Sequence, residues 1–156
     1  ASRRFVDDMG ALLVPWGMPN AAGRLYAYLL QSSAPASLDD IAADLGLAKS
    51  SACVAARLLE RHALARRQGV PGSKRVLYEA SDLFAGLLEA QSALLGSLGN
   101  LLEARAPGVA TGEPLARMER VAGFSLAVRD AMDGVIARYA QDDAEPSAET
   151  MGQGGR

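Results

Sequence analysis

The sequence has little of what disulfides and metal sites require, with one cysteine, Cys53, and one histidine, His62, in 156 residues. A lone cysteine excludes a disulfide within these residues and is typical of a reducing compartment, so we expect a cytoplasmic protein. Two potential ligands cannot complete a zinc site, and we expect no metal and no other cofactor. No run of about 18 apolar residues occurs, and the N-terminal stretch carries acids early, so we expect neither a membrane span nor a secretory signal.

Catalytic groups are equally scarce. A nucleophile and its base would both have to come from Cys53 and His62, which fall in one predicted cationic helix. Paired acids such as Asp39 and Asp40 lie at predicted helix starts or in a tail, where capping or solvation explains them. The stretch from Gly69 to Lys74 lacks the glycine spacing of a phosphate-binding loop. We therefore expect a protein that is not an enzyme.

Aromatic residues make up only 5% of the chain, and Ala and Leu supply much of the 49% that is hydrophobic. This composition predicts a mainly α-helical fold. Asn20 is a suitable N-cap for a helix that ends before Ser32. An earlier helix is predicted within residues 2–14, with an apolar face made of Phe5, Met9, Leu12 and Leu13.

Residues 37–62 have the pattern of a helix-turn-helix. Ser37, three residues before Asp40, resembles a capping box and predicts a helix over Leu38–Leu45. Gly46 can adopt the left-handed conformation of a sharp turn. A second helix is then predicted from Lys49 to about His62. Small residues on its inward face allow the two helices to cross closely, namely Ala52, Ala55, Ala56, Leu59 and Ala63.

The outward face of this second helix carries Lys49, Ser50, Cys53, Arg57 and Arg61, with Ser51 and Val54 beside them. Cationic, compact and hydrogen-bonding groups suit a helix that lies in the DNA major groove. Two short segments, Leu64–Gln68 and Val76–Ala80, flank a Gly- and Pro-containing stretch and predict a β-hairpin. Such a hairpin is a wing, whose tip would bring Lys74 and Arg75 to phosphates or the minor groove.

The charge distribution favours the same interpretation. The chain has 16 Lys and Arg against 18 Asp and Glu, a net charge of −2. The stretch between Leu47 and Glu79 contains seven cationic residues and two acidic ones, a net charge of +5. The rest of the chain therefore carries −7. This asymmetry indicates a polyanionic partner that meets one face of the protein, with a solvated basic face as the alternative.

A leucine-rich helix is predicted after Ser81, its N-cap, and is expected to break at Ala106-Pro107-Gly108. A last helix follows from about Pro114 to Tyr139. These helices form either a hairpin folded on its own domain or, as we expect, a dimer interface built from both ends of the chain. The predicted organisation is an N-terminal dimerisation helix (1–19), a winged helix-turn-helix domain (20–80), C-terminal dimerisation helices (81–141) and a disordered tail (142–156).

Three segments together resemble the MarR superfamily of bacterial winged helix-turn-helix regulators, and the GbsR-like branch looks closest. They are FVDDMGALLVPWGMPNAAGRLYAYLL (Phe5–Leu30), SLDDIAADLGLAKSSACVAARLLE (Ser37–Glu60) and PGSKRVLYEA (Pro71–Ala80). The resemblance implies a homodimer that binds double-stranded DNA at pseudo-palindromic operators, often as a repressor that a small ligand releases. The sequence departs from the family at Ala48, where a serine N-cap is usual, and at Cys53, where serine is common.

The residue chemistry and this resemblance imply DNA contacts from Lys49, Ser50, Ser51, Cys53, Arg57, Arg61, Ser73, Lys74 and Arg75. The effector is unknown. Several large side chains, Tyr26 among them, could line its cavity. The candidates for ligand binding are Trp16, Tyr28 and Phe84. Cys53 is either a redox sensor or a small packing or groove-facing residue, and Arg24 either contacts a ligand or DNA or pairs with Asp7 or Asp8. The alternative function is a winged-helix protein-interaction module without sequence-specific DNA binding.

Overall fold

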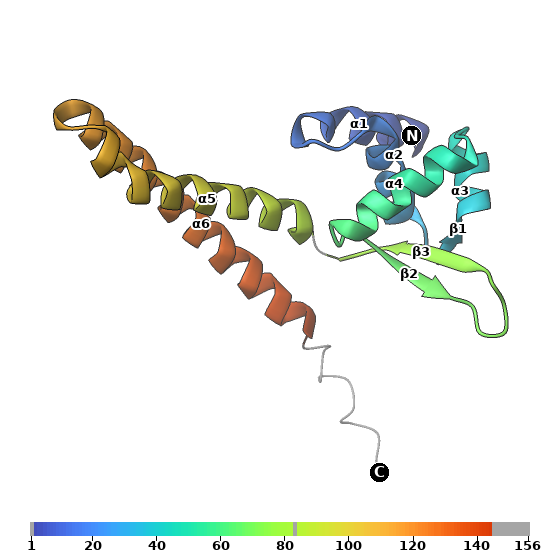
Figure 1. The fold of residues 1–156 in the computed structure, drawn as a ribbon. Coiled ribbons are helices and arrows are strands. Elements are labelled where there is room, and N and C mark those ends of the chain that lie inside the picture. Colours follow the sequence, from blue (N-terminus) through green and yellow to red (C-terminus); the bar gives the residue numbers. More distant parts are fainter. Residues whose placement is uncertain (1, 83, 145–156) are drawn as a thin grey trace, which may run out of the picture. The chain divides into compact units, whose positions relative to one another are not determined.

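The structure, a computed structural model, describes residues 2–82 and 84–144. Its elements are α1 (Ser2–Leu12), the 3-10 helix η1 (Val14–Trp16), α2 (Asn20–Gln31), β1 (Ala36–Ser37), α3 (Leu38–Leu45), α4 (Lys49–Arg61), β2 (Ala65–Gly69), β3 (Val76–Ala80), α5 (Ala85–Val109) and α6 (Gly112–Ala144) (Figure 1). The prediction of a mainly α-helical chain with a small β-hairpin is confirmed. The chain forms two compact units, Ala1–Leu87 and Leu88–Arg156, so that α5 begins in the first and continues in the second.

Helix α2 is the centre of the first unit, where it contacts α1, α3, α4 and β3. Leu25 of α2, Ile41 of α3 and Leu59 of α4 are fully buried in its core. Burying one such side chain contributes about 1.5–3 kcal/mol to folding. Because side chains from all these elements share the core, the helix-turn-helix and the hairpin are held in one body.

The small sheet joins the hairpin to the start of α3. Its strand order is β1-β3-β2, and both pairings are antiparallel. Ser37, the last residue of β1, lies opposite Leu77, and Arg66 of β2 lies opposite Glu79. The hairpin follows α4 directly and its loop extends away from the helices (Figure 1). The predicted winged helix-turn-helix fold is thus confirmed, with β2 beginning one residue later than expected.

Local sequence signals set the boundaries of α3 and α4. The Ser37 Oγ accepts a hydrogen bond from the Asp40 backbone N–H at 3.2 Å, which confirms the predicted cap. The Ser37 hydroxyl also donates to the Asp40 carboxylate at 2.7 Å. Gly46 ends α3 with φ of +64°, where residues with a side chain are strained. Helix α4 begins at Lys49 behind Ala48, which supplies no side-chain cap.

Helices α1 and α2 cross at two glycines. A Cβ on Gly23 would lie 2.9 Å from the Cα of Gly10 and 2.9 Å from the Met9 carbonyl oxygen. A Cβ on Gly10 would lie 2.6 Å from the Arg24 side chain. Neither position has room for a side chain, so the backbones of the two helices approach as closely as glycine allows.

Two expectations about the N-terminal region need correction. Of the predicted apolar face, Met9 and the following Leu13 do lie on the buried side with Val6 and Gly10, but Phe5 and Leu12 are exposed, because the crossing at Gly10 turns them toward solvent. Asn20 is the first residue of α2 and does not cap it. The N-cap is Pro19, whose carbonyl accepts the hydrogen bonds of the Ala22 and Gly23 N–H groups.

Three further boundaries differ from the prediction. Ala63 does not continue the inward face of α4, because it adopts a left-handed φ of +54° just beyond the helix. Ser81 is not the N-cap of α5, because α5 begins only at Ala85, and the Ser81 N–H bonds the Leu64 carbonyl beside the hairpin. Pro107 does not end α5, which continues to Val109, and the chain reverses at Gly112, whose φ is +61°. A proline in the last turn removes only one intrahelical hydrogen bond there.

In the second unit, α5 and α6 pack as an antiparallel pair. Ser92 near the start of α5 donates to Asp133, and Gly99, two turns later, faces the Ala122 carbonyl and Leu126. Helix α6 extends past Tyr139 to Ala144, into the segment predicted to be disordered, and the rest of that tail lies outside the described residues. Large apolar side chains remain exposed along both helices, among them Leu94, Leu98, Leu101, Val121, Phe124 and Val135.

The crossing of α1 and α2 predicts a loss of stability in Gly23→Ala. The added Cβ would overlap backbone atoms of α1, which cannot move away as a flexible side chain could, so we expect the free energy of unfolding to fall by about 1–3 kcal/mol. Urea denaturation followed by circular dichroism measures this change. Gly134→Ala is the matched control, because Gly134 is also helical and has nothing within 4 Å of its added Cβ. It should leave stability equal or raise it by up to about 1 kcal/mol. Equal stability of the Gly23→Ala variant and the wild type would contradict the close crossing.

Candidate nucleic-acid interface

Helix α4 divides into a buried small-residue face and an exposed polar face. Ala52, Ala55, Ala56 and Leu59 are buried, as predicted. The opposite face exposes the predicted contacts Lys49, Ser50, Ser51, Arg57 and Arg61, whereas Cys53 is half-buried. Val54, which was not among the candidates, is 67% exposed on this face.

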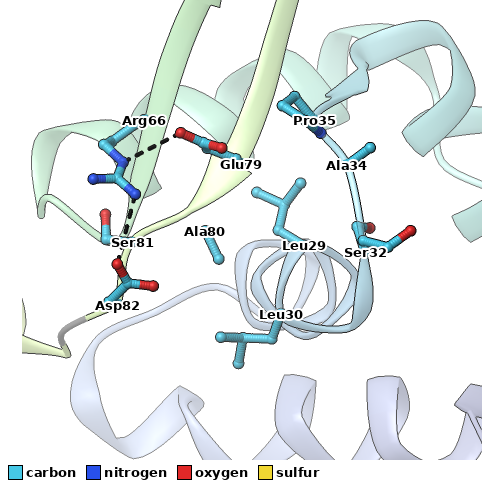
Figure 2. A pocket seen from close by; sticks show the side chains of 11 residues that line it. Leu29, Leu30, Ser32, Ala34, Pro35, Arg66, Glu79, Ala80, Ser81 and Asp82 are labelled. Carbon is cyan, nitrogen blue, oxygen red and sulfur yellow. Dashed lines mark ion pairs between the residues drawn. The ribbon is translucent and has the colours of Figure 1, made fainter. Parts of the chain in front are cut away.

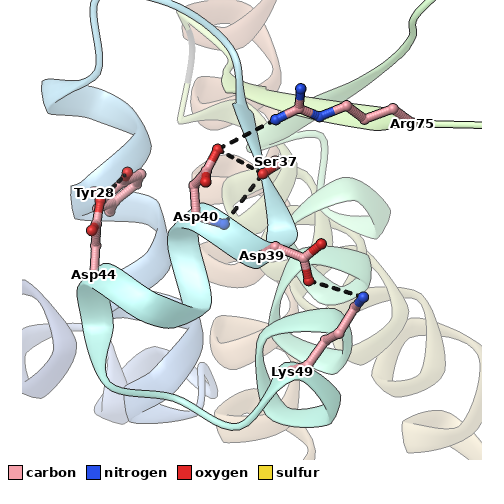
Figure 3. Close-up of polar contacts among 7 residues, drawn as sticks. All are labelled: Tyr28, Ser37, Asp39, Asp40, Asp44, Lys49 and Arg75. Carbon is pink, nitrogen blue, oxygen red and sulfur yellow. Dashed lines mark hydrogen bonds and ion pairs between the residues drawn. The ribbon is translucent and has the colours of Figure 1, made fainter. Parts of the chain in front are cut away.

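Two acids at the start of α3 each pair with a predicted DNA contact. Asp39 lies 2.9 Å from the ammonium nitrogen of Lys49, and this contact raises the pKa of Lys49. Asp40 lies 3.6 Å from the guanidinium of Arg75 in the wing. Figure 3 shows both pairs, which place the first turn of α3 between the N-terminus of α4 and the wing.

These pairs are exposed, so water screens them and they contribute little to folding stability. They nevertheless place negative charge beside two of the seven cations between Leu47 and Glu79, the basic window of the sequence. Sequence reasoning assigned Asp39 and Asp40 to helix capping and missed their pairing. Lys49 lies ten residues beyond Asp39, across the turn at Gly46, so no short-range spacing rule connects them.

The tip of the wing is a compact turn. The Val70 N–H bonds the Arg75 carbonyl, the Ser73 N–H bonds the Val70 carbonyl, and Gly72 has φ of +74°. The Ser73 hydroxyl accepts a bond from the Arg75 N–H at 3.0 Å. Ser73 therefore shapes the turn, and the predicted contacts Lys74 and Arg75 are exposed on it.

The remaining cations of the basic window differ in whether a carboxylate lies beside them. Within the described residues, no carboxylate lies within 4.0 Å of Arg57, Arg61, Arg67 or Lys74. Arg66 is instead bridged to Glu79 at 3.4 Å and Asp82 at 3.8 Å. Figure 2 shows these two ion pairs beside an open pocket of about 370 Å³ that Leu29 and Leu30 also line. The charge of Arg66 is thus largely balanced within the first unit.

The three candidate ligand-binding residues do not all come together. Trp16 and Phe84 meet edge to face with ring centroids 5.9 Å apart, and Tyr26 lies 6.0 Å from Phe84. Tyr28 instead donates its hydroxyl hydrogen to Asp44 at 2.7 Å. Burial, this hydrogen bond and the charges of Asp44 and Asp40 raise the pKa of Tyr28 to about 12. The aromatic cluster therefore consists of Trp16, Tyr26 and Phe84.

Arg24 forms the ion pair that was one of its two predicted roles. Its Nε lies 3.1 Å from Asp7 of α1, and its terminal nitrogen donates to the Leu45 carbonyl at the end of α3, also at 3.1 Å. One side chain on α2 thus joins three helices. The last two residues of the stretch GMPNAAGR (Gly17–Arg24) thus have structural roles. Gly23 lets the α1 and α2 backbones approach, and Arg24 links both helices to the end of α3.

In the part of the chain that the structure describes, no group of three or more His, Cys, Asp or Glu side chains could hold a metal ion. None of the described helices combines the length and the hydropathy needed to cross a bilayer.

Comparison with solved structures supports the fold. A crystal structure described as a transcriptional regulator superposes with a TM-score of 0.73 at 22% identity, covering 90% of this chain and 98% of the other. A MepR mutant from a multidrug-resistant S. aureus clinical isolate gives a TM-score of 0.42 at 18% identity, covering 81% of this chain and 87% of the other. Only the first similarity is close enough to bear on the fold, and at this identity it bears on the fold alone. No protein-family model matches the sequence, and no curated protein matches it.

The position of Arg24 predicts that its loss destabilises the first unit. In Arg24→Ala, the Leu45 carbonyl loses its side-chain donor and Asp7 loses its cation, so we expect the free energy of unfolding to fall by about 1–3 kcal/mol. Asp7→Asn should cost less than about 1 kcal/mol, because the Asp7 side chain is mostly exposed. Urea titrations of the two variants measure the difference. Equal losses in the two variants would show that the bond to Leu45 contributes nothing.

Proposed function

We propose that this chain is a DNA-binding transcriptional regulator of the MarR superfamily, in its GbsR-like branch. It acts in the cytoplasm as a homodimer on a pseudo-palindromic operator, as a repressor that a small-molecule effector releases. The observation that carries the proposal is the convergence at the first turn of α3. There Asp39 contacts Lys49 of the exposed α4 face, and Asp40 contacts Arg75 of the wing.

Through these contacts, Lys49 and Arg75 lie on one side of the helix-turn-helix, where both can bind DNA phosphates. Arg57 and Arg61 continue the exposed cationic face along α4, and Lys74 lies at the tip of the wing. Phosphate neutralisation by such side chains supplies affinity without sequence preference. Ser50, Ser51 and Arg57 carry hydrogen-bonding groups of the kind that read base edges in the major groove. Ser73 orders the wing, and the half-buried Cys53 is peripheral to the contact.

The exposed apolar side chains of each unit would form the dimer interface. Residues 1–19 expose Phe5, Leu12, Val14 and Trp16, and residues 81–141 expose leucines on α5 together with Phe124 and Val135 on α6. Contact between copies through both ends of the chain would remove this surface from water, which is the main favourable term in association. The dimer then places two α4 helices in successive major grooves, about 34–36 Å apart.

The effector site is proposed at the aromatic cluster. Trp16 is partly exposed and lies against Phe84, which is two residues before Gly86 at the start of α5. The backbone of Gly86 in turn contacts the carbonyl of His62, at the end of α4. A ligand that displaces Phe84 would thus disturb the contact between the end of α4 and the start of α5.

Selection of binding sites from a randomised duplex pool of about 30 base pairs, at near-physiological salt, tests this proposal. We expect an inverted repeat whose half-sites are about one helical turn apart, because a two-fold dimer reads a two-fold site. Retention of DNA without any enriched motif would contradict specific readout. Failure to retain DNA, together with capture of a protein partner through the apolar helices, would instead favour the interaction module.

The acid pairs predict that Asp39 restrains DNA affinity. In Asp39→Asn the side chain keeps its shape but no longer neutralises Lys49 or repels phosphates, so we expect severalfold tighter binding to any duplex and a steeper dependence on salt. Asp44→Asn is the matched control, since it removes the same charge from an exposed α3 residue that pairs with Tyr28. Fluorescence anisotropy titrations at several salt concentrations compare the two variants. Equal gains would mean that only net charge matters.

A further inference from the structure

The centre of the exposed α4 face is apolar. Val54 lies one turn after Ser50 and Ser51 and one turn before Arg57, positions that share a face of an α-helix. Its side chain is 67% exposed, although its neighbours along this face are hydroxyl and guanidinium groups. Valine is also a poorer helix former than alanine, which occupies the buried positions Ala52, Ala55 and Ala56 of the same helix.

A shallow apolar groove lies beside Val54. It has a volume of about 300 Å³ and runs between the start of α2 and the part of α4 from Ser50 to Leu58, where Pro19, Ala22, Val54 and Leu58 line it. Ser50 and Ser51 also line it. The groove therefore accepts a small apolar group that projects from a polar partner.

Charge around the groove restricts the nature of that partner. Lys49 lies at one end of this face and Arg57 at the other, and no carboxylate lies within 4.0 Å of Arg57 among the described residues. A polyanion with a protruding methyl group matches this arrangement. Duplex DNA has such a group in the major groove, namely the 5-methyl of thymine, which no other standard base carries.

We infer that Val54 is a specificity-determining residue that contacts the 5-methyl group of a thymine in each half-site, an assignment that rests on the proposed function. Ser50 and Ser51 bind the edges of neighbouring bases, while Lys49 and Arg57 flank the contact with charge. The selectivity is for thymine over cytosine and over uracil at one position, because the apolar side chain gains only from a methyl group that it covers.

Two parallel selections test the inference, one from a randomised pool made with thymidine and one from a pool made with deoxyuridine. Uracil pairs as thymine does and lacks only the methyl group. Wild-type protein should enrich an A·T pair at one fixed position of each half-site in the first pool and lose that preference in the second, with the other positions unchanged. Val54→Ala should enrich the same motif from both pools.

Titrations of the selected duplex measure how much affinity the thymine methyl group contributes. Replacing the contacted thymine with deoxyuridine in one half-site should weaken wild-type binding about fourfold, the value expected for one buried methyl group. Val54→Ala should bind both duplexes equally. Leu30→Ala is the matched control, because Leu30 is an exposed aliphatic residue of α2 at 44%, outside the α4 face and the proposed dimer segments, and it should keep the wild-type difference.

Four outcomes overturn the inference. An identical motif from both pools with wild-type protein would overturn the inference and leave the proposed function intact. A thymine preference that persists in Val54→Ala would have the same consequence. A changed oligomeric state of Val54→Ala in sedimentation would assign the groove to a second copy of the chain. Failure to retain any duplex would remove the proposed function as well. An unchanged thermal midpoint of Val54→Ala shows that the variant is folded, since the side chain is largely exposed.

Discussion

The close crossing of α1 over α2 is the contact on which the geometry of the first unit depends. Two glycines, Gly10 and Gly23, let the backbones meet, and the adjacent Arg24 then reaches both Asp7 and the Leu45 carbonyl. Leu45 is the last residue of α3, so this bond fixes the end of α3 that leads through Gly46 into α4. Ser37, joined to the sheet by β1, fixes the other end. Helix α3 is therefore held at both ends, and its first turn can serve as a common support for α4 and the wing.

This support has electrostatic consequences. The basic window carries a net charge of +5 in the sequence, yet Lys49, Arg66 and Arg75 each contact a carboxylate in the fold. In the proposed complex with DNA, phosphates would compete with those carboxylates, whereas Arg57, Arg61 and Lys74 would need no such exchange. Such a surface would lower the affinity for arbitrary polyanions more than the affinity for a site that also satisfies the groups on α4. Discrimination in that proposal depends on α4, where Val54 lies between the hydroxyl groups of Ser50 and Ser51 and the guanidinium of Arg57.

The second unit contributes in another way. Helices α5 and α6 pack through small residues, with Gly96 and Gly99 admitting the side chains of Arg129 and Leu126. Such close packing uses little of the leucine side chains, and Leu94, Leu98 and Leu101 stay exposed. The same small residues that bring the two helices together therefore leave a large apolar surface outside their contact, and the proposed dimer would cover it.

The sequence by itself determined the winged helix-turn-helix, the cap at Ser37, the turn at Gly46 and the span of α4, because those signals act between residues a few positions apart. Tertiary structure decided the features that depend on distant partners. It turned Phe5 and Leu12 outward, since the crossing at Gly10 rotates α1, and it kept Ser81 in the hairpin through a bond to Leu64. It separated Tyr28 from Trp16 and Phe84 and paired Asp39 with Lys49. Local spacing carries no information about which residues meet across a turn or between helices, and only the packed core settles that.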